Sequence, residues 1–255
     1  EVYQKQSVLV EHDLIEVQGL FLKKEKSLLS PRKLSKDFQT NIALLDLEDR
    51  LPQASFAQKV LDFLQDKQIA FVQAQTGIGK TYGYLLPALS LENEKGILLS
   101  VPTKILQNQI IQEEARRLEE VFHLSIHSLK GPQNYLKLDA LHLALQEEET
   151  NRLYTRFKMQ LLVWLTETDT GDLDEIGQLY RYQQFLPNLV HDGKLSKDSL
   201  FWLEDFWKRS QKKARNCQLL VTNHAYLVTR LEDDPSILEG RLLILDEAQK
   251  ILLTL

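Results

Sequence analysis

The sequence predicts an α/β fold, in which helices flank a parallel β-sheet and a mainly helical insertion interrupts it. Four short apolar runs lie at residues 69–72, 97–101, 219–222 and 242–245. None of them alternates between apolar and polar residues, which indicates strands covered on both faces. A helical spacing of apolar residues follows the second run, from Thr103, a candidate N-cap, to Phe122. Strands that alternate with such helices favour a parallel sheet.

Changes of composition divide the chain into three parts. Residues 1–45 are predicted to form a small β element, with alternating stretches at 7–10 and 14–22, followed by a linker rich in Ser, Lys and Pro. The sheet domain is assigned to residues 46–131 and 214–255. Between these segments, residues 132–213 are polar and aromatic with helical patterning, and we expect them to form the insertion.

Composition excludes several classes of protein. A net charge of −5 excludes a general polyanion binder, so a nucleic-acid contact would need a local basic patch. The only cysteine, Cys217, excludes an internal disulfide and an all-cysteine metal site. No apolar run approaches the roughly twenty residues of a membrane-spanning helix. The N-terminus resembles no signal peptide, so we expect a cytoplasmic protein without membrane contact. Because the chain begins with Glu1, we expect a piece of a longer protein.

A phosphate-binding loop is predicted directly after the first strand. It comprises Ala74, Gln75, Thr76, Gly77, Ile78, Gly79, Lys80 and Thr81, with Ala74 in place of the usual first glycine. Glycines let backbone N–H groups approach phosphates, and the following helix N-terminus favours negative charge. Lys80 would reach the β- and γ-phosphate oxygens, and the Thr81 hydroxyl would bind Mg²⁺. A simple turn into a helix is the alternative, but the preceding strand favours the nucleotide site.

Two carboxylates follow the last predicted strand. Asp246 would hold Mg²⁺, directly or through water, and Glu247 would orient and deprotonate the attacking water. Acidic pairs after strands are common by chance. The phosphate-binding loop upstream favours the catalytic interpretation, with Lys80, Asp246 and Glu247 as the catalytic residues.

Together these motifs resemble those of superfamily 2 helicases, and further motifs resemble the DinG/XPD group. Residues 48–53 (EDRLPQ) look like an adenine-recognising element, which implies nucleotide contacts by Arg50 and Gln53. Residues 101–109 (VPTKILQNQ) resemble the motif that touches the DNA backbone, which implies contacts by Thr103, Lys104 and Gln107. Residues 129–136 (LKGPQNYL) and 221–227 (VTNHAYL) are similar to signatures of the group.

The resemblance implies a RecA-like lobe of an ATP-dependent DNA helicase or translocase, which uses ATP and Mg²⁺. Its partners would be single-stranded or forked DNA, in repair or replication. As in Gram-positive DinG proteins, the parent chain would hold a second RecA-like lobe and a preceding exonuclease domain, and the isolated lobe would be inactive. Two alternatives stay open: an ATP-modulated accessory lobe of a DNA exonuclease without unwinding activity, and a module that only senses ATP.

The sequence departs from the group at several positions. Many members of the group hold an iron–sulfur cluster with four cysteines. At the positions that match the first and last of these cysteines, this chain has Lys137 and Asp205. We therefore expect no cluster, and an insertion held by apolar packing; the candidates are Phe201, Trp202, Phe206 and Trp207. Gln249 replaces a usual His and cannot titrate near neutrality. The resemblance makes His224 a structural or DNA-side residue and not a catalytic one.

A basic cluster lies at the end of the insertion, beside Trp202 and Trp207. It consists of Lys208, Arg209, Lys212, Lys213 and Arg215. Cations that follow phosphates and aromatic rings that stack on bases are typical of single-stranded DNA paths, so the first four are candidate DNA contacts. A solvated helix face is an equally good interpretation of the same pattern.

Overall fold

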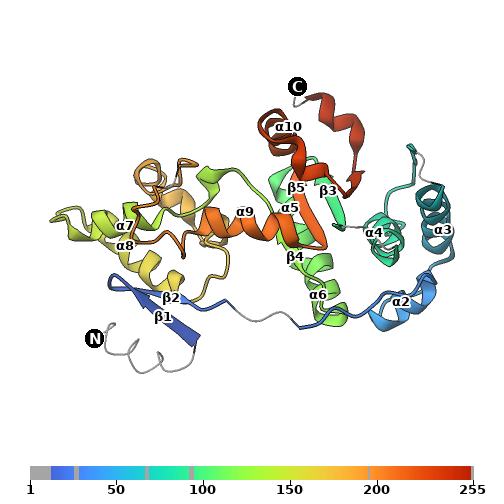
Figure 1. Ribbon diagram of the computed structural model, residues 1–255, viewed down its shortest axis with the longest axis horizontal. Coiled ribbons are helices and arrows are strands. Elements are labelled where there is room, and N and C mark those ends of the chain that lie inside the picture. Colours follow the sequence, from blue (N-terminus) through green and yellow to red (C-terminus); the bar gives the residue numbers. More distant parts are fainter. Residues whose placement is uncertain (1–12, 26–28, 67–68, 92–94, 195, 254–255) are drawn as a thin grey trace. The chain divides into compact units, whose positions relative to one another are not determined.

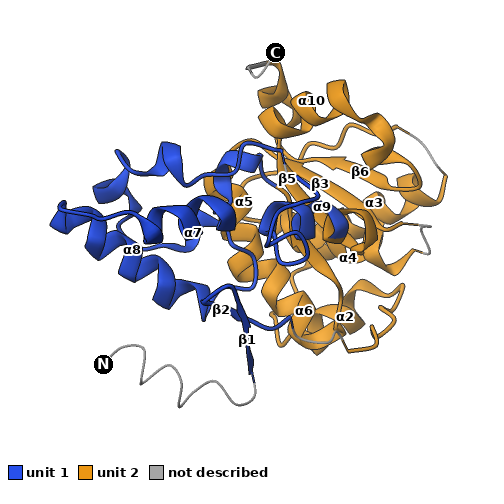
Figure 2. Ribbon diagram, turned by 60° about the vertical axis from the view of Figure 1, so that its left-hand side comes forward, with its two compact units in different colours: residues 1–27, 130–212 blue, residues 28–129, 213–255 orange. Residues whose placement is uncertain are grey.

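The computed structural model describes residues 13–25, 29–66, 69–91, 95–194 and 196–253. The chain divides into two compact units, coloured separately in Figure 2. The insertion unit comprises residues 1–27 and 130–212, and the sheet unit comprises residues 28–129 and 213–255. No helix in the described part of the chain is long and apolar enough to cross a membrane.

The sheet unit is built on four parallel strands in the order β4-β5-β3-β6 (Figures 1 and 2). The strands are β3 (Ile97–Val101), β4 (Ile126–Ser128), β5 (Leu219–Asn223) and β6 (Leu242–Leu245). The register pairs Ile97 with Leu219 on one side and with Leu242 on the other. The carboxyl ends of all four strands therefore meet at one edge of the sheet. The predicted α/β class and three of the four predicted strands are confirmed.

The prediction of a strand at residues 69–72, before the phosphate-binding loop, is wrong. These residues form no ladder, and Ile69 and Phe71 are 93% and 91% exposed. Among the described residues β6 pairs with β3 alone, and its Leu243 is 37% exposed. An apolar run shows what a segment would gain by burial, but a strand also needs a partner edge in register, which local sequence does not specify.

Helices cover both faces of this sheet. In the sheet unit they are α2 (Phe38–Leu44), α3 (Leu51–Gln65), α4 (Lys80–Ser90), α5 (Lys104–Ile110), the π-helical η1 (Ile111–Ala115), α6 (Arg116–Phe122) and α10 (His224–Asp233), with 3₁₀ turns at Pro235–Leu238 and Ala248–Leu253. On one face Leu99 packs in a common core with Leu85 of α4 and Phe122 of α6. On the other face Ser100 meets His224 of α10. The predicted helix from Thr103 to Phe122 is confirmed, as α5, η1 and α6 in succession.

The insertion unit has a core of its own. Its elements are the hairpin β1 (Leu14–Val17) and β2 (Leu20–Lys23), α7 (Leu138–Gln146), α8 (Arg152–Leu165), the 3₁₀ turns Pro132–Asn134, Leu173–Glu175, Leu179–Tyr182 and Leu186–Asn188, and the start of α9 (Phe206–Asn216). Leu20 and Leu22 are buried with Phe157, Phe201 and Phe206. The β element predicted at residues 14–22 is confirmed; the one at 7–10 lies outside the described residues.

A buried ion pair lies where the chain enters the insertion. The ammonium group of Lys130 is almost wholly buried, 2.5 Å from an oxygen of Asp172 and 2.8 Å from one of Asp174. Burial raises the pKa of Asp172, although the lysine opposes this shift. A buried cation needs such partners, because a lone charge in this position is strongly unfavourable.

Gly171 is required by the packing of the insertion core. Its φ of +69° lies in the left-handed region, and a Cβ atom there would collide with the ring of Phe206. Gly177, six residues further on, has open space around its Cα. The two glycines form a matched pair, in which a side chain would collide with its surroundings at Gly171 and not at Gly177.

Gly171→Ala should destabilise the folded chain by about 2–5 kcal/mol, because a left-handed conformation for alanine costs about 1–2 kcal/mol and overpacking adds about 1–3. Chemical denaturation of the chain measures the effect. Gly177→Ala is the control and should change the unfolding free energy by less than about 0.5 kcal/mol. Equal stability of the two variants would contradict this account of the core.

Candidate functional site

The predicted phosphate-binding loop leads directly into α4, whose first residue is Lys80. Gly77 and Gly79 both adopt positive φ, at +82° and +80°. The buried Gln53 of α3 donates from Nε2 to the Gly79 carbonyl oxygen at 2.8 Å, and a Cβ atom on Gly79 would collide with this amide. Gln53, predicted to recognise adenine, thus holds the last turn of the loop. Arg50 is exposed, and its guanidinium lies 3.0 Å from Glu48.

Asp246 is held at the carboxyl edge of the sheet through three of its groups. Its N–H donates to the Ser100 carbonyl at 2.9 Å, and its own carbonyl accepts from Nε2 of His224 at 3.0 Å. Its carboxylate Oδ2 accepts from the hydroxyl of Tyr84 at 3.1 Å. The backbone and the side chain of the predicted metal ligand are therefore both constrained.

Thr81 and Asp246, the two predicted Mg²⁺ ligands, both lie near the phenol of Tyr84. Asp246 accepts its hydrogen bond, and Thr81 comes one turn before it on α4 and is also a neighbour of Glu114. Burial, reinforced by the charge of Asp246, raises the pKa of Tyr84 far above its usual range, so the phenol stays a donor. Burial also raises the pKa of Glu114. A hydroxyl and a carboxylate oxygen are suitable ligands for Mg²⁺.

The sequence pattern did not single out Tyr84 or Glu114. Tyr84 lies three residues after Thr81 in α4, so the two side chains share one helix face. That spacing was a usable signal. Glu114 lies in the π-helical turn η1, far along the chain from the loop, and no sequence signal points to it.

Glu247, the predicted general base, has an unusual backbone and a cationic neighbour. Its φ of +49° places a non-glycine residue in the left-handed region, which costs free energy and often marks functional sites. Its Oε2 lies 2.6 Å from the ammonium group of Lys250. The carboxylate would have to leave this ion pair before it could accept a proton from water.

His224 is a structural residue in this arrangement. Its Nε2 contacts the carbonyl of Asp246, which can only accept, so this nitrogen carries the hydrogen. Nδ1 then accepts from the Ser100 hydroxyl at 2.7 Å. Burial lowers the pKa of His224, so the ring is neutral. A neutral imidazole that joins the ends of two strands supports the structural interpretation and not the catalytic one.

Two of the three residues assigned to the DNA-backbone motif are exposed. Thr103 caps α5 by accepting from the Leu106 N–H at 3.2 Å, and Lys104 follows it at the surface. Gln107 is a correction, because its side chain is fully buried. Its amide donates to the carbonyl of Val221 and accepts from Asn223 at 2.9 Å. Its hydrogen bonds are made inside the sheet unit, so it is not a DNA contact here.

The predicted basic cluster lies on α9, where Lys208 and Arg209 contact other residues of the insertion unit. The Lys208 ammonium lies 3.6 Å from the centroid of the Trp202 ring and donates to the Trp202 carbonyl at 2.9 Å. The Arg209 guanidinium lies 2.7 Å from Glu25. Lys212 is exposed and Lys213 is half-buried. A simple solvated face therefore does not describe Lys208 and Arg209.

Lys137 and Asp205, at the positions where an iron–sulfur cluster would need cysteines, do not fit such a cluster. The Lys137 ammonium lies 2.9 Å from Asp192, and the buried Asp205 caps α9 by accepting from the Lys208 N–H at 2.8 Å. The other Asp205 oxygen lies 3.3 Å from the buried His191. Burial raises the pKa of Cys217 to about 11, so its thiol is not a ready ligand. In the described residues, no three His, Cys, Asp or Glu side chains gather as a metal site would require.

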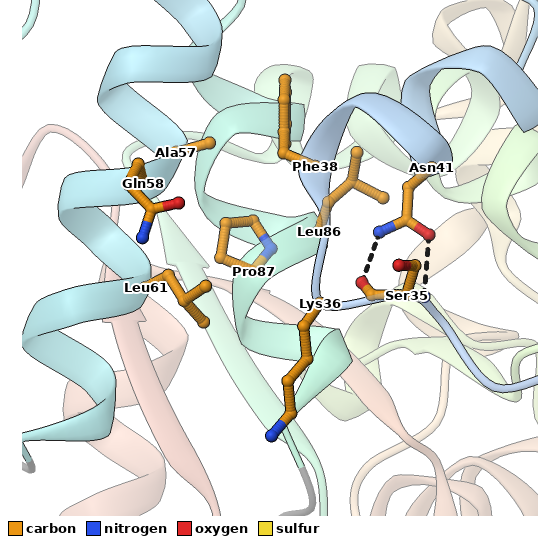
Figure 3. A pocket seen from close by; sticks show the side chains of 9 residues that line it. All are labelled: Ser35, Lys36, Phe38, Asn41, Ala57, Gln58, Leu61, Leu86 and Pro87. Carbon is orange, nitrogen blue, oxygen red and sulfur yellow. Dashed lines mark hydrogen bonds between the residues drawn. The ribbon is translucent and has the colours of Figure 1, made fainter.

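Two cavities of the sheet unit lie away from the predicted site residues. Figure 3 shows one of about 10 Å³ between α2, α3 and α4, beside Asn41, whose amide bridges the backbone of Ser35. Its volume admits about one water molecule. A groove of about 630 Å³ lies at the amino ends of β3 and β5, next to Gly96 and Gln218. The nucleotide site is predicted at the opposite, carboxyl edge.

Comparison with protein families finds a DEAD/DEAH box helicase domain at residues 52–176. This range contains the phosphate-binding loop, α4, β3 and α5. The matched range also extends into the insertion and ends just after the 3₁₀ turn Leu173–Glu175.

Curated relatives are similar along most of the chain. A protein of Staphylococcus saprophyticus named 3'-5' exonuclease DinG is 32% identical over 215 residues, which cover 81% of this chain and 23% of that protein. Its namesake from Bacillus subtilis is 33% identical over 198 residues, 71% of this chain and 20% of the relative. A Staphylococcus aureus protein of the same name is 31% identical over 188 residues. The chain thus spans between a fifth and a quarter of these relatives.

Metal analysis of the purified chain should find neither stoichiometric iron nor acid-labile sulfide, because Lys137 and Asp205 make other contacts where thiolates would be needed. Cys217→Ser is the control and should leave the metal content unchanged, since its buried thiol is not a ligand. Stoichiometric iron with visible charge-transfer absorption would overturn this expectation.

Proposed function

The chain belongs to the DinG-type family of DEAD/DEAH box helicases, and on that basis we propose that it is the ATP-binding lobe of a DNA helicase or translocase. The lobe would bind ATP with Mg²⁺ at the carboxyl edge of the sheet. The longer protein would supply a second RecA-like lobe and an exonuclease domain, and would act on single-stranded or forked DNA in repair or replication. We expect it to work in the cytoplasm.

The observation that carries this proposal is the hydrogen bond of 3.1 Å to Asp246 from the hydroxyl of Tyr84, which lies three residues after Thr81 on α4. Asp246 follows β6 and so lies at the carboxyl edge of the parallel sheet, where its carboxylate accepts from a side chain of α4, the helix that follows the loop. In open α/β sheets ligands bind at this edge. The adjoining loop has two glycines at positive φ and leads into a helix N-terminus, which suits a phosphate group.

The residues of the site divide the chemistry among them. Backbone N–H groups of residues 74–79 would cradle the phosphates, and Lys80 would neutralise charge on the transferred phosphoryl group. Mg²⁺, when held by Thr81 and Asp246, would polarise the phosphate oxygens. Glu247 would accept the proton of the attacking water once its carboxylate has left Lys250. Arginines of the second lobe would complete the site.

DNA is proposed to contact two places on the chain. In the sheet unit these are Thr103 and Lys104, at the exposed start of α5. On α9 we keep Lys212 and Lys213 as the leading contacts. Lys208 and Arg209 would contribute charge while they maintain their contacts with Trp202 and Glu25.

A second candidate is an ATP-modulated accessory lobe of an exonuclease, without unwinding activity. The support for it is the name 3'-5' exonuclease that the relatives carry. A strand-displacement assay on the full-length protein separates the two: ATP-dependent displacement supports the helicase, and ATP-dependent change in degradation alone supports the accessory lobe.

Lys80→Ala in the full-length protein should lower ATP hydrolysis on the order of 100-fold or more, because it removes the cation that meets developing charge. Glu247→Gln should lower turnover by a similar factor while ATP binding persists, since it removes a base and not a phosphate ligand. Steady-state hydrolysis and equilibrium binding of a fluorescent ATP analogue measure the two effects.

Lys59→Ala, at an exposed position of α3, is the control for Lys80, and Glu232→Gln, at an exposed position of α10, is the control for Glu247. Both controls should retain hydrolysis. If Glu247→Gln hydrolysed ATP at the parental rate, Glu247 would not be the general base.

Lys212→Gln combined with Lys213→Gln should weaken binding of single-stranded DNA and lower its salt dependence. Removing one phosphate-binding cation lowers the slope of log affinity against log salt by about 0.7, so the double variant should lower it by about 1.4. Fluorescence anisotropy of a labelled oligonucleotide at several salt concentrations measures the slope.

The matched control removes two exposed cations elsewhere, with Lys36→Gln and Lys59→Gln in the sheet unit. It should leave the slope unchanged. If both double variants gave the parental slope, α9 would not follow the DNA backbone.

A further inference from the structure

We propose that Tyr84 is a positioning residue, whose hydroxyl fixes the orientation of the Asp246 carboxylate and leaves its other oxygen for the metal. The inference rests on the proposed ATP-binding function and deepens it. It concerns a side chain that lies outside both sequence motifs of the site, hydrogen-bonds Asp246 of one, and lies three residues after Thr81 of the other on the same helix.

The phenol of Tyr84 is enclosed and keeps its proton. The side chain is 7% exposed, and its ring belongs to the core between α4 and the sheet. A buried hydroxyl needs a partner, and this one finds it in Asp246 Oδ2, at 3.1 Å. Because carboxylate oxygens only accept, the Tyr84 hydrogen points toward Asp246.

Asp246 has little other freedom. Its N–H is bound to the Ser100 carbonyl and its C=O to His224, so its backbone is fixed at the end of β6. The side-chain torsions are what remain, and they place the two carboxylate oxygens. The hydrogen bond from Tyr84 engages Oδ2 and thereby selects one orientation, in which Oδ1 is available to a cation.

The same phenol links the two elements that carry the predicted metal ligands. Thr81 is at the start of α4 and Asp246 follows β6, and the hydroxyl of Tyr84 on α4 hydrogen-bonds Asp246. Preorganised ligands bind a metal more tightly, because less conformational freedom is lost on binding. A change of one atom in this side chain should therefore alter the metal dependence of the site without altering the ligands themselves.

Tyr84→Phe in the full-length protein is the central test, because it removes the hydroxyl and keeps the buried ring. A fluorescent ATP analogue is bound at increasing Mg²⁺, and we expect the half-saturating Mg²⁺ concentration to rise on the order of 10-fold, as for loss of a hydrogen bond to a charged group. Binding in EDTA should not change. In hydrolysis, kcat at limiting Mg²⁺ should fall and recover as Mg²⁺ is raised.

Tyr82→Phe is the matched control. Tyr82 lies two residues away on α4, is half-buried, and makes contact through its hydroxyl with Arg117 and not with Asp246. Its variant should show the parental Mg²⁺ dependence. In an Asp246→Asn background, adding Tyr84→Phe should have a smaller effect than in the parent, because the two changes remove one interaction.

The outcomes separate the inference from the function it rests on. If the parent protein shows no Mg²⁺-dependent nucleotide binding, the proposed function fails and the inference fails with it. If the parent binds and Tyr84→Phe retains the parental Mg²⁺ dependence, the inference alone is overturned. Thermal unfolding checks the fold of each variant, and Tyr84→Met, which fills similar space without a hydroxyl, takes the place of a phenylalanine variant that does not fold.

Discussion

The candidate site depends on one neutral imidazole that joins the ends of neighbouring parallel strands. His224 follows β5 and bridges the hydroxyl of Ser100 on β3 to the carbonyl of Asp246 after β6. Without this bridge two buried polar groups would lose their partner, and Asp246, whose carboxylate we propose binds the metal, would lose a backbone anchor. The chemistry proposed for Asp246 and Glu247 thus starts from a contact made by neither side chain.

Much of the fold could be predicted from the sequence, because burial on both faces leaves a clear signal in β3, β5 and β6. The run at residues 69–72 carries the same signal and is exposed coil, because pairing with an edge is a property of the whole sheet. Residue type and spacing predicted the phosphate-binding loop and Asp246 as site residues. They did not predict Tyr84 or Glu114, because these two lie beside the predicted ligands through contacts between elements distant in sequence. Gln107 was assigned to DNA from a motif, and only its burial reveals the structural role.

Polar contacts join separate segments of the insertion unit. Two consecutive residues, His191 and Asp192, face Asp205 and Lys137. The segment between α8 and α9 is thereby linked to the start of α7 and to the start of α9. Aromatic packing supplies the rest, with the rings of Phe157 and Tyr182 stacked 4.3 Å apart.

The hairpin of β1 and β2 gives the insertion unit a particular order of assembly. Leu20 and Leu22 are translated early, yet they are buried against Phe201 and Phe206, which leave the ribosome much later. At translation rates of about 5–20 residues per second, the apolar face of the hairpin stays without its final partners on the order of ten seconds or more. Strand β3 is synthesised in this interval, after the hairpin and before Phe201 and Phe206. The nascent chain therefore passes through a state in which the apolar face of the hairpin lacks its partners and is a candidate for chaperone binding.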